Sequence, residues 1–196
     1  MGDKLKIHIN DRSKTVVKFL LMLFVIGIFI GVYAYLIQDT NTKNAINLEL
    51  TSLLSNLANV KQNSIIYHFI TISLMIILSL SVIGLPLVLF YYFYEGISIG
   101  FLITSFIKYK KFKGFTYSLI FIGISKLLYI AILTYFLVQS LNYAFKILKN
   151  IKENKKDLII RQLIKCAFTI GICFINDIIL YFIGNKLASI FTFIIN

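Results

Sequence analysis

The sequence predicts an all-α, polytopic integral membrane protein with five transmembrane helices. Hydrophobic residues make up 59% of the 196 residues, which is well above the fraction usual for soluble domains. A chain of this size has too little interior to bury so much apolar surface. Charged residues are only 14% and lie between long apolar runs. The net charge of +12 fits basic residues at the cytoplasmic ends of membrane helices. We expect no nucleic-acid binding, because no basic helix with interleaved polar side chains is present.

The first predicted span covers residues 16–37 and follows a basic tail at residues 1–15. Its apolar run of about 22 residues is longer than the core of a signal peptide and lacks a small-residue cleavage site. The run ends in the interfacial aromatics Tyr33 and Tyr35. We therefore expect a retained anchor whose N-terminus lies in the cytoplasm.

Residues 38–63 form a long polar stretch, which we predict to be an external loop. Five apolar residues in this loop recur at a spacing that places them on one face of a helix. They are Ile46, Leu50, Leu53, Leu54 and Leu57. We expect an amphipathic helix that lies in the outer membrane interface. The alternative is a docking face for a partner outside the membrane.

The apolar block from Ser64 to Ile107 is too long for one crossing. It contains the single proline of the chain, in the triplet Gly84-Leu85-Pro86. Proline removes a helical hydrogen bond and glycine relaxes the backbone, so the block is expected to break there. The prediction is one span at 65–83 and another at 86–107, joined by a tight turn at Gly84 and Pro86.

The fourth predicted span covers residues 115–137, and a basic cytoplasmic connector follows at residues 142–162. The fifth span covers residues 163–183, and a short apolar tail follows at 184–196. Five spans place the larger share of the lysines and arginines inside, as the positive-inside rule favours. The Lys108–Lys113 cluster is the exception, because this topology places it on the outer face.

Two charged residues lie deep in neighbouring spans that run in opposite directions. Glu95 lies nine residues into the third span and Lys126 eleven residues into the fourth. Both therefore lie roughly 13–14 Å from the cytoplasmic edge of the hydrocarbon core. Isolated charges at this depth are costly, so we predict that Glu95 and Lys126 face each other. Such a pair acts either as a polar clamp between two helices or as part of a proton or ion relay.

Two small-xxx-small patterns, Gly27/Gly31 and Gly96/Gly100, lie in the first and third spans. Small residues at this spacing let helix backbones approach closely in lipid. We predict that these glycines form helix-packing grooves, including grooves for the membrane anchor of a partner. The sequence contains no nucleophile with an adjacent base, no phosphate-binding loop and no metal-ligand spacing. We therefore expect a non-enzymatic protein without a catalytic, metal or cofactor-binding site.

The stretch Ile83–Leu89, followed by Tyr94–Phe101, resembles the signature of the stage II sporulation protein M family. This signature has a Gly-Leu-Pro turn, an apolar run, a polar residue before a glycine, and a second glycine four residues later. The sequence Lys113-Gly114-Phe115 matches a further element of the family. The charge at Glu95 is not a family requirement, which favours a structural polar position over a relay.

The resemblance implies a membrane component of the engulfment machinery in endospore-forming bacteria. Proteins of this family act with stage II sporulation proteins D and P, two membrane-anchored peptidoglycan hydrolases. The chain is thus expected to be a scaffold that recruits these partners at the septal and engulfing membrane of the mother cell. The alternative is a small membrane transporter or permease subunit, such as the substrate-binding component of a vitamin-uptake system. A transporter requires a cavity with convergent polar groups near the middle of the membrane.

Overall fold

The computed structural model describes residues 2–56, 62–148 and 155–195. Side chains are described for residues 13–50, 69–148 and 156–179, except at 117, 120, 121, 124 and 125. The described residues form helices and no strands, so the all-α prediction is confirmed. The helices are α1 (Gly2–Leu36), α2 (Thr40–Asn56), α3 (Gln62–Leu78), α4 (Leu85–Ser125), α5 (Leu127–Leu148) and α6 (Lys155–Ile195).

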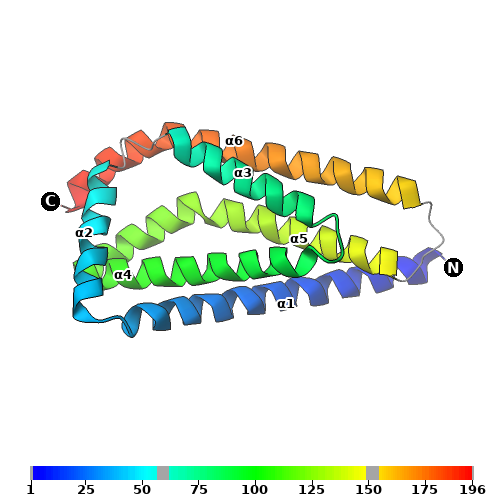
Figure 1. Cartoon of the computed structure of the whole chain (residues 1–196), viewed down its shortest axis with the longest axis horizontal. Helices are drawn as coiled ribbons and strands as arrows, with labels where there is room; N and C mark the ends of the chain where they lie inside the picture. Colours follow the sequence, from blue (N-terminus) through cyan, green and yellow to red (C-terminus); the bar gives the residue numbers. More distant parts are fainter. Residues whose placement is uncertain (1, 57–61, 149–154, 196) are drawn as a thin grey trace.

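The long helices lie side by side as an elongated bundle (Figure 1). α1 runs along one edge, α3 and α6 run along the opposite edge, and α4 and α5 lie between them. α2 stands across one end of the bundle and connects its two edges. The most extensive contact between two described helices joins α1 to α4.

Four helical segments among the described residues are long and apolar enough to cross a membrane. They are Ser13–Leu36, Leu85–Thr116, Leu127–Leu148 and Lys156–Ile179. The predicted span at 65–83 corresponds to α3, which has 17 residues. A helix of this length rises only about 25 Å, less than the ~30 Å hydrocarbon core. The protein is therefore a multi-pass membrane protein, and the prediction of five spans is not confirmed.

The connection between α3 and α4 begins earlier than the sequence predicts. α3 ends at Leu78, and the reversal runs through residues 79–84, so that it ends at the first residue of the Gly-Leu-Pro triplet. The Gly84 N–H donates to the Ser81 carbonyl at 3.1 Å. A Cβ atom at Gly84 would lie 2.0 Å from the Leu78 carbonyl oxygen, so the reversal requires glycine here. Pro86 then lies in the first turn of α4, where its missing N–H costs least.

α4 folds back on itself at Lys111, which has the non-helical angles φ 53° and ψ −124°. The returning half contacts the first half closely, since a Cβ atom at Gly114 would lie 1.9 Å from the Phe106 carbonyl oxygen. The segments predicted at 86–107 and 115–137 thus lie on opposite sides of this turn. The predicted fourth span is not one helix, because α4 ends at Ser125 and α5 begins at Leu127.

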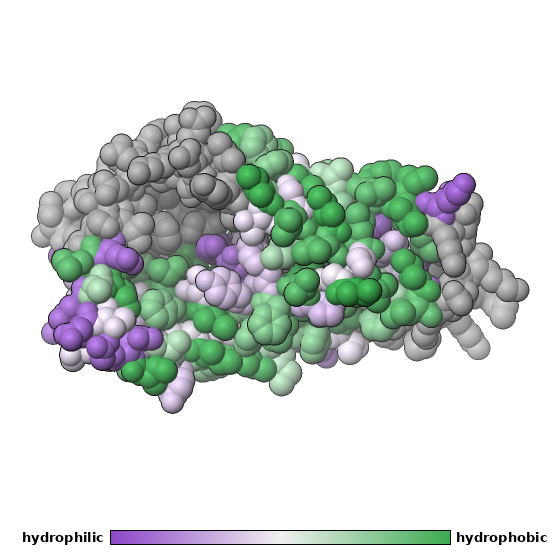
Figure 2. All heavy atoms as spheres, in the orientation of Figure 1, coloured by the Kyte–Doolittle hydropathy of each residue, from purple (hydrophilic) through white to green (hydrophobic). Residues whose placement is uncertain are grey.

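The buried core is formed by side chains from α1, α3, α4, α5 and α6. It comprises Leu20, Ile72, Ile76, Val88, Tyr92, Tyr129, Leu133, Phe136, Leu137, Val138, Cys166 and Cys173. Many large hydrophobic side chains are nevertheless exposed, and the face in Figure 2 is hydrophobic over most of its described length. This distribution is expected for a bundle whose solvent is lipid.

Candidate functional site

The two glycine pairs pack directly against each other where α1 crosses α4. A Cβ atom at Gly31 would lie 2.0 Å from the Ile97 carbonyl oxygen, and one at Gly100 would lie 2.1 Å from the Ile28 carbonyl oxygen. A Cβ atom at Gly96 would lie 3.4 Å from the Gly27 Cα. The backbones of α1 and α4 therefore touch, as small-xxx-small faces permit in lipid.

This contact corrects one prediction. Gly27, Gly31, Gly96 and Gly100 do form a helix-packing surface, but the prediction that they form an open groove for a partner's anchor is wrong. The two glycine faces cover each other within one chain. A partner helix therefore has to use another surface of the bundle.

The structure brings Glu95 and Lys126 together, with 2.9 Å between the Lys126 Nζ and the Glu95 Oε2. The Glu95 side chain is 8% exposed and that of Lys126 is 27% exposed. The Tyr91 hydroxyl donates to the Glu95 Oε1 at 2.9 Å, and the Tyr91 and Tyr129 hydroxyls lie 2.9 Å apart. Because Tyr91 donates to Glu95, Tyr129 acts as the donor to Tyr91.

Each oxygen of the Glu95 carboxylate therefore accepts a hydrogen bond from a side chain. Lys126 also lies 5.6 Å from the centre of the Tyr129 ring, a distance at which a cation is attracted to the ring face. A carboxylate that is paired and hydrogen-bonded in this way can remain charged in a bundle interior. This network ties α4 to α5 near the middle of the bundle.

Sequence reasoning missed several other polar contacts between helices. The Tyr92 and Thr134 hydroxyls lie 2.9 Å apart, and the Gln162 Nε2 donates to the Ser140 Oγ at 3.2 Å. Uncharged polar residues inside apolar spans are the signal that could have identified these contacts, because such side chains seek partners on neighbouring helices in lipid.

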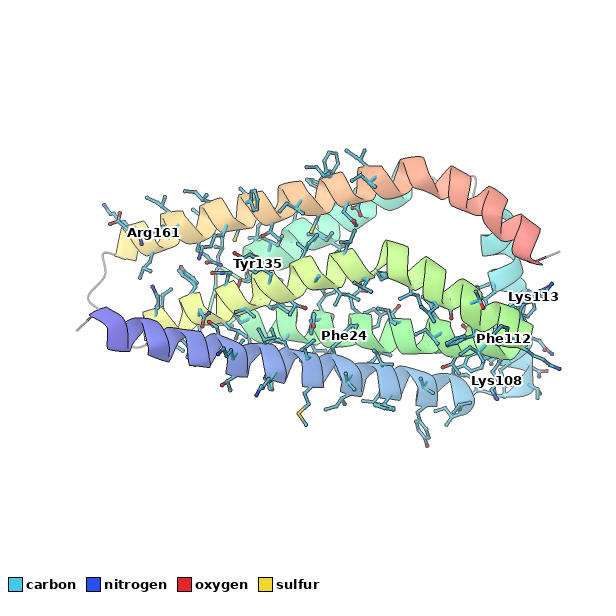
Figure 3. The ribbon with its side chains drawn as sticks, turned by 180° about the vertical axis from the view of Figure 1, so that it is seen from behind. Phe24, Lys108, Phe112, Lys113, Tyr135 and Arg161 are labelled. Atoms are coloured by element: carbon cyan, nitrogen blue, oxygen red, sulfur yellow. The ribbon has the colours of Figure 1, made fainter. Side chains whose placement is uncertain are left out.

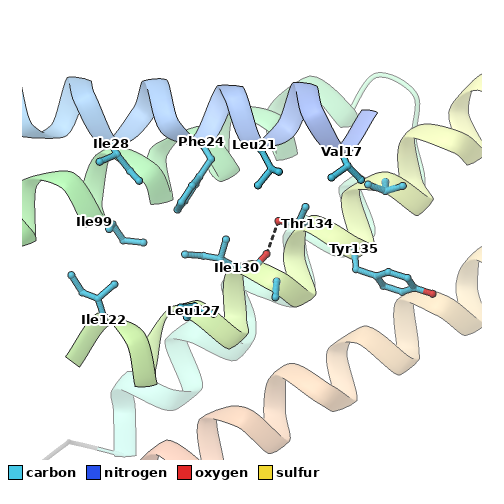
Figure 4. Close-up of a pocket in the computed structure, with 12 residues that line it drawn as sticks. Val17, Leu21, Phe24, Ile28, Ile99, Ile122, Leu127, Ile130, Thr134 and Tyr135 are labelled. Carbon is cyan, nitrogen blue, oxygen red and sulfur yellow. Dashed lines mark hydrogen bonds between the residues drawn. The ribbon is translucent and has the colours of Figure 1, made fainter. Parts of the chain in front are cut away.

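An apolar groove of about 630 Å³ lies between α1, α4 and α5 (Figure 4). We call it the α1–α5 groove. It is lined by Val17, Leu21, Phe24, Ile28, Ile99, Ile122, Leu127, Ile130, Ala131, Thr134, Tyr135 and Val138. The lining contains no charged side chain, so this groove lacks the convergent polar groups expected of a solute-binding cavity.

Comparison with known families decides the identity of the chain. The family described as stage II sporulation protein M matches residues 20–182. The chain belongs to the stage II sporulation protein M family. A search of curated proteins and a search of solved structures each found no match. The matched residues include the glycine contact and the ion pair of Glu95 with Lys126.

In this stage II sporulation protein M family member, part of the predicted amphipathic face lies against the bundle. Leu50 is buried and Ile46 is half-buried, and α2 packs on α4. The side chains of Leu53 and Leu54 and the whole of Leu57 lie outside the described residues. Hydrogen bonding from Thr42 lowers the pKa of Asp39, the residue that precedes α2.

The basic cluster at 108–113 lies at the α4 turn of this family member (Figure 3). Phe112 is 81% exposed and stands between the exposed residues Lys111 and Lys113. An exposed aromatic residue with flanking lysines is typical of a position at a membrane interface. The described residues contain no group of three metal-ligating side chains.

Proposed function

We propose that this protein is a non-enzymatic membrane scaffold that holds stage II sporulation proteins D and P during engulfment. Membership of the stage II sporulation protein M family over residues 20–182 carries the proposal. In the proposed arrangement the N-terminus lies in the cytoplasm and the protein acts in the septal and engulfing membrane of the mother cell. α2 then lies at the outer interface, near the parts of the two hydrolases that follow their membrane anchors.

The outward face of α1 is the surface we propose for a partner's anchor. The α1 span has the smallest buried share of the four candidate spans, 17%. Five of its residues repeat at alternating spacings of three and four and are 43–70% exposed. They are Phe19, Met22, Ile26, Phe29 and Tyr33. This spacing is the pattern of a helix-pairing seam, and we call these residues the α1 seam.

The α1 seam also has a suitable length for pairing with a single helix. From Phe19 to Tyr33 it rises roughly 21 Å, which is most of the ~30 Å hydrocarbon core. Because the opposite side of α1 is held against α4 by the glycine contact, the seam is presented on a fixed helix. A partner that pairs with it does not need to disturb the bundle.

Site-specific photo-crosslinking in sporulating cells tests the proposal. A crosslinking amino acid is placed at Met22 or Phe29 in the seam, or at Phe168 on α6 as a matched control. Phe168 is 67% exposed and Phe29 is 70% exposed, so the two positions differ mainly in location. We expect the two hydrolases to be captured from the seam and not from Phe168.

A tagged pull-down in mild detergent, with mass spectrometry, provides an independent readout. Recovery of both hydrolases supports the scaffold. Absence of both hydrolases from the pull-down and from the crosslinks would contradict it, and recovery of an ATPase pair would favour the transporter alternative. Capture of the hydrolases at Phe168 alone would retain the scaffold but move the docking surface to α6.

A further inference from the structure

The α1–α5 groove occupies a definite depth of the bilayer. Its α1 wall runs from Val17 to Ile28, a rise of about 16 Å. The α1 span begins at Ser13, so the groove runs from about 6 Å to about 22 Å along that span, a length of about half a ~30 Å core. It is therefore a half-membrane groove, unlike the α1 seam.

The length of the groove suits an acyl chain as its occupant. Its α1 wall is about 16 Å long, whereas a transmembrane helix has to cross the whole ~30 Å core. An acyl chain is much thinner, bends easily, and has the length of one leaflet.

The wall of the groove offers few free hydrogen-bonding groups. Thr134 contributes a hydroxyl, which donates to the Ile130 carbonyl at 2.7 Å and accepts from the Tyr92 hydroxyl at 2.9 Å. Its hydrogen-bonding capacity is thus used within the protein. The other hydroxyl of the lining belongs to Tyr135, whose ring points away from the remaining lining side chains (Figure 4). The wall therefore favours hydrocarbon as an occupant.

Positive charge lies at the N-terminal end of the α1 wall of the groove. Lys14 continues the stripe of Val17, Leu21, Phe24 and Ile28, because the spacings along α1 are three, four, three and four. Lys18 follows Val17, and both lysines are exposed. The Asn142 Nδ2 donates to the Ser13 Oγ at 3.2 Å, which joins α5 to α1 beside Lys14.

We infer that the α1–α5 groove binds one acyl chain of an anionic phospholipid, whose phosphate lies at Lys14 and Lys18. The apolar wall takes the hydrocarbon, the length of the groove is close to the thickness of one leaflet, and the lysines complement the charge of the headgroup. Bound lipid fills the space between α1 and the α4–α5 pair. The inference does not depend on the proposed scaffold function.

Tryptophan fluorescence tests this inference, because the chain contains no Trp. L21W places a single fluorophore in the groove, and M22W places one at almost the same depth on the lipid-facing seam. Each full-length variant is reconstituted in mixed phosphatidylglycerol and phosphatidylcholine vesicles in which one lipid carries brominated acyl chains. Bromine quenches a nearby Trp, so the comparison reports which lipid occupies each position.

For L21W we expect quenching that corresponds to an anionic-lipid preference of about five- to thirtyfold, the range for two lysines near a headgroup. For M22W we expect nearly equal quenching by the two lipids. In the L21W background, A131F fills the groove and should abolish the preference, whereas G171F should leave it unchanged. Gly171 has open space around it and does not line the groove.

K14Q/K18Q should remove the preference of L21W for the anionic lipid while leaving quenching by both lipids. Equal quenching of L21W by the two lipids, or a preference that survives A131F, would overturn the inference. Native mass spectrometry of the unsubstituted protein serves as the second measurement. We expect one retained phosphatidylglycerol per chain and its loss in A131F but not in G171F, and retention of no lipid counts against the groove.

Discussion

Replacing Gly31 by alanine should separate α1 from α4. The new Cβ atom would lie 2.0 Å from the Ile97 carbonyl oxygen, whereas real Cβ contacts essentially never fall below 3.0 Å. The helices must therefore move apart by at least 1.0 Å, because the obstructing atom is backbone and cannot rotate away. Overpacking of this kind costs about 1–3 kcal/mol. We expect the upper end, about 3 kcal/mol, which corresponds to roughly a hundredfold change in the unfolding equilibrium.

Reversible unfolding in mixed detergent and SDS, followed by circular dichroism, measures this effect. G27A should cost less, about 1 kcal/mol, because its Cβ atom would lie 2.7 Å from the Phe93 carbonyl oxygen. G171A is the control, since nothing lies within 4 Å of its Cβ position. It should be neutral or stabilising by up to about 1 kcal/mol through helix propensity. If G31A unfolds like G171A, the close contact of the two backbones is not real.

Three further predictions concern other parts of the molecule. K126M should destabilise the protein by about 3 kcal/mol because it leaves the Glu95 carboxylate buried without its cation. In the same unfolding assay, the double variant K126M/E95Q should recover at least ~1 kcal/mol of this loss. If the effects of the two substitutions simply add, the ion pair is not real. The first turn of α2 should be fully stable at a pH above the ordinary pKa of a carboxyl group and should lose stability as the pH falls through the lowered pKa of Asp39. Amide exchange measures this stability. D39N, which still caps the helix, should abolish the pH dependence. K111G should stabilise the protein by about 1 kcal/mol because glycine adopts the positive φ angle of this position without strain. K110G, which lies inside the helix, should destabilise it by a similar amount. Equal effects of the two substitutions in unfolding experiments would show that Lys111 is not strained.

The depth of charged residues could be predicted from the sequence because helix rise is nearly constant. Counting residues from the ends of two antiparallel spans placed Glu95 opposite Lys126, and the structure joins them at 2.9 Å. The Tyr91 contact with Glu95 was not predicted, because tyrosines are common in these spans and spacing alone does not select one. The sequence therefore predicts the depth of a residue in the membrane, but not the direction in which its side chain points around the helix axis.

The glycine patterns could be recognised, but their partner could not. Small residues at i and i+4 indicate that some backbone approaches closely. Nothing in the pattern distinguishes a helix of the same chain from a helix of another protein. Two such patterns in one chain can satisfy each other, as Gly27/Gly31 and Gly96/Gly100 do here.

The end of α3 was misplaced because hydropathy does not separate a helix from an apolar turn. Residues 79–83 are Ser-Leu-Ser-Val-Ile, which read as a continuation of the span. The Ser79 hydroxyl donates to the Ile76 carbonyl at 2.6 Å, and the Ser81 hydroxyl accepts from the Ile83 N–H at 3.2 Å. Serine side chains that bond to nearby backbone in this way compete with the helix and favour turns.

The contact between Gly27 and Gly96 has a consequence for how the protein is made. Sixty-nine residues separate the two glycines, so synthesis of the second follows the first by roughly 3 to 14 seconds at ~5–20 residues per second. During that interval α1 has to remain in the bilayer with its glycine face against lipid. Its own length, apolarity and basic N-terminal end are sufficient for this. Insertion of α1 and its packing against α4 are thus separate events in time, and a fault in the second leaves an inserted but unpaired first helix.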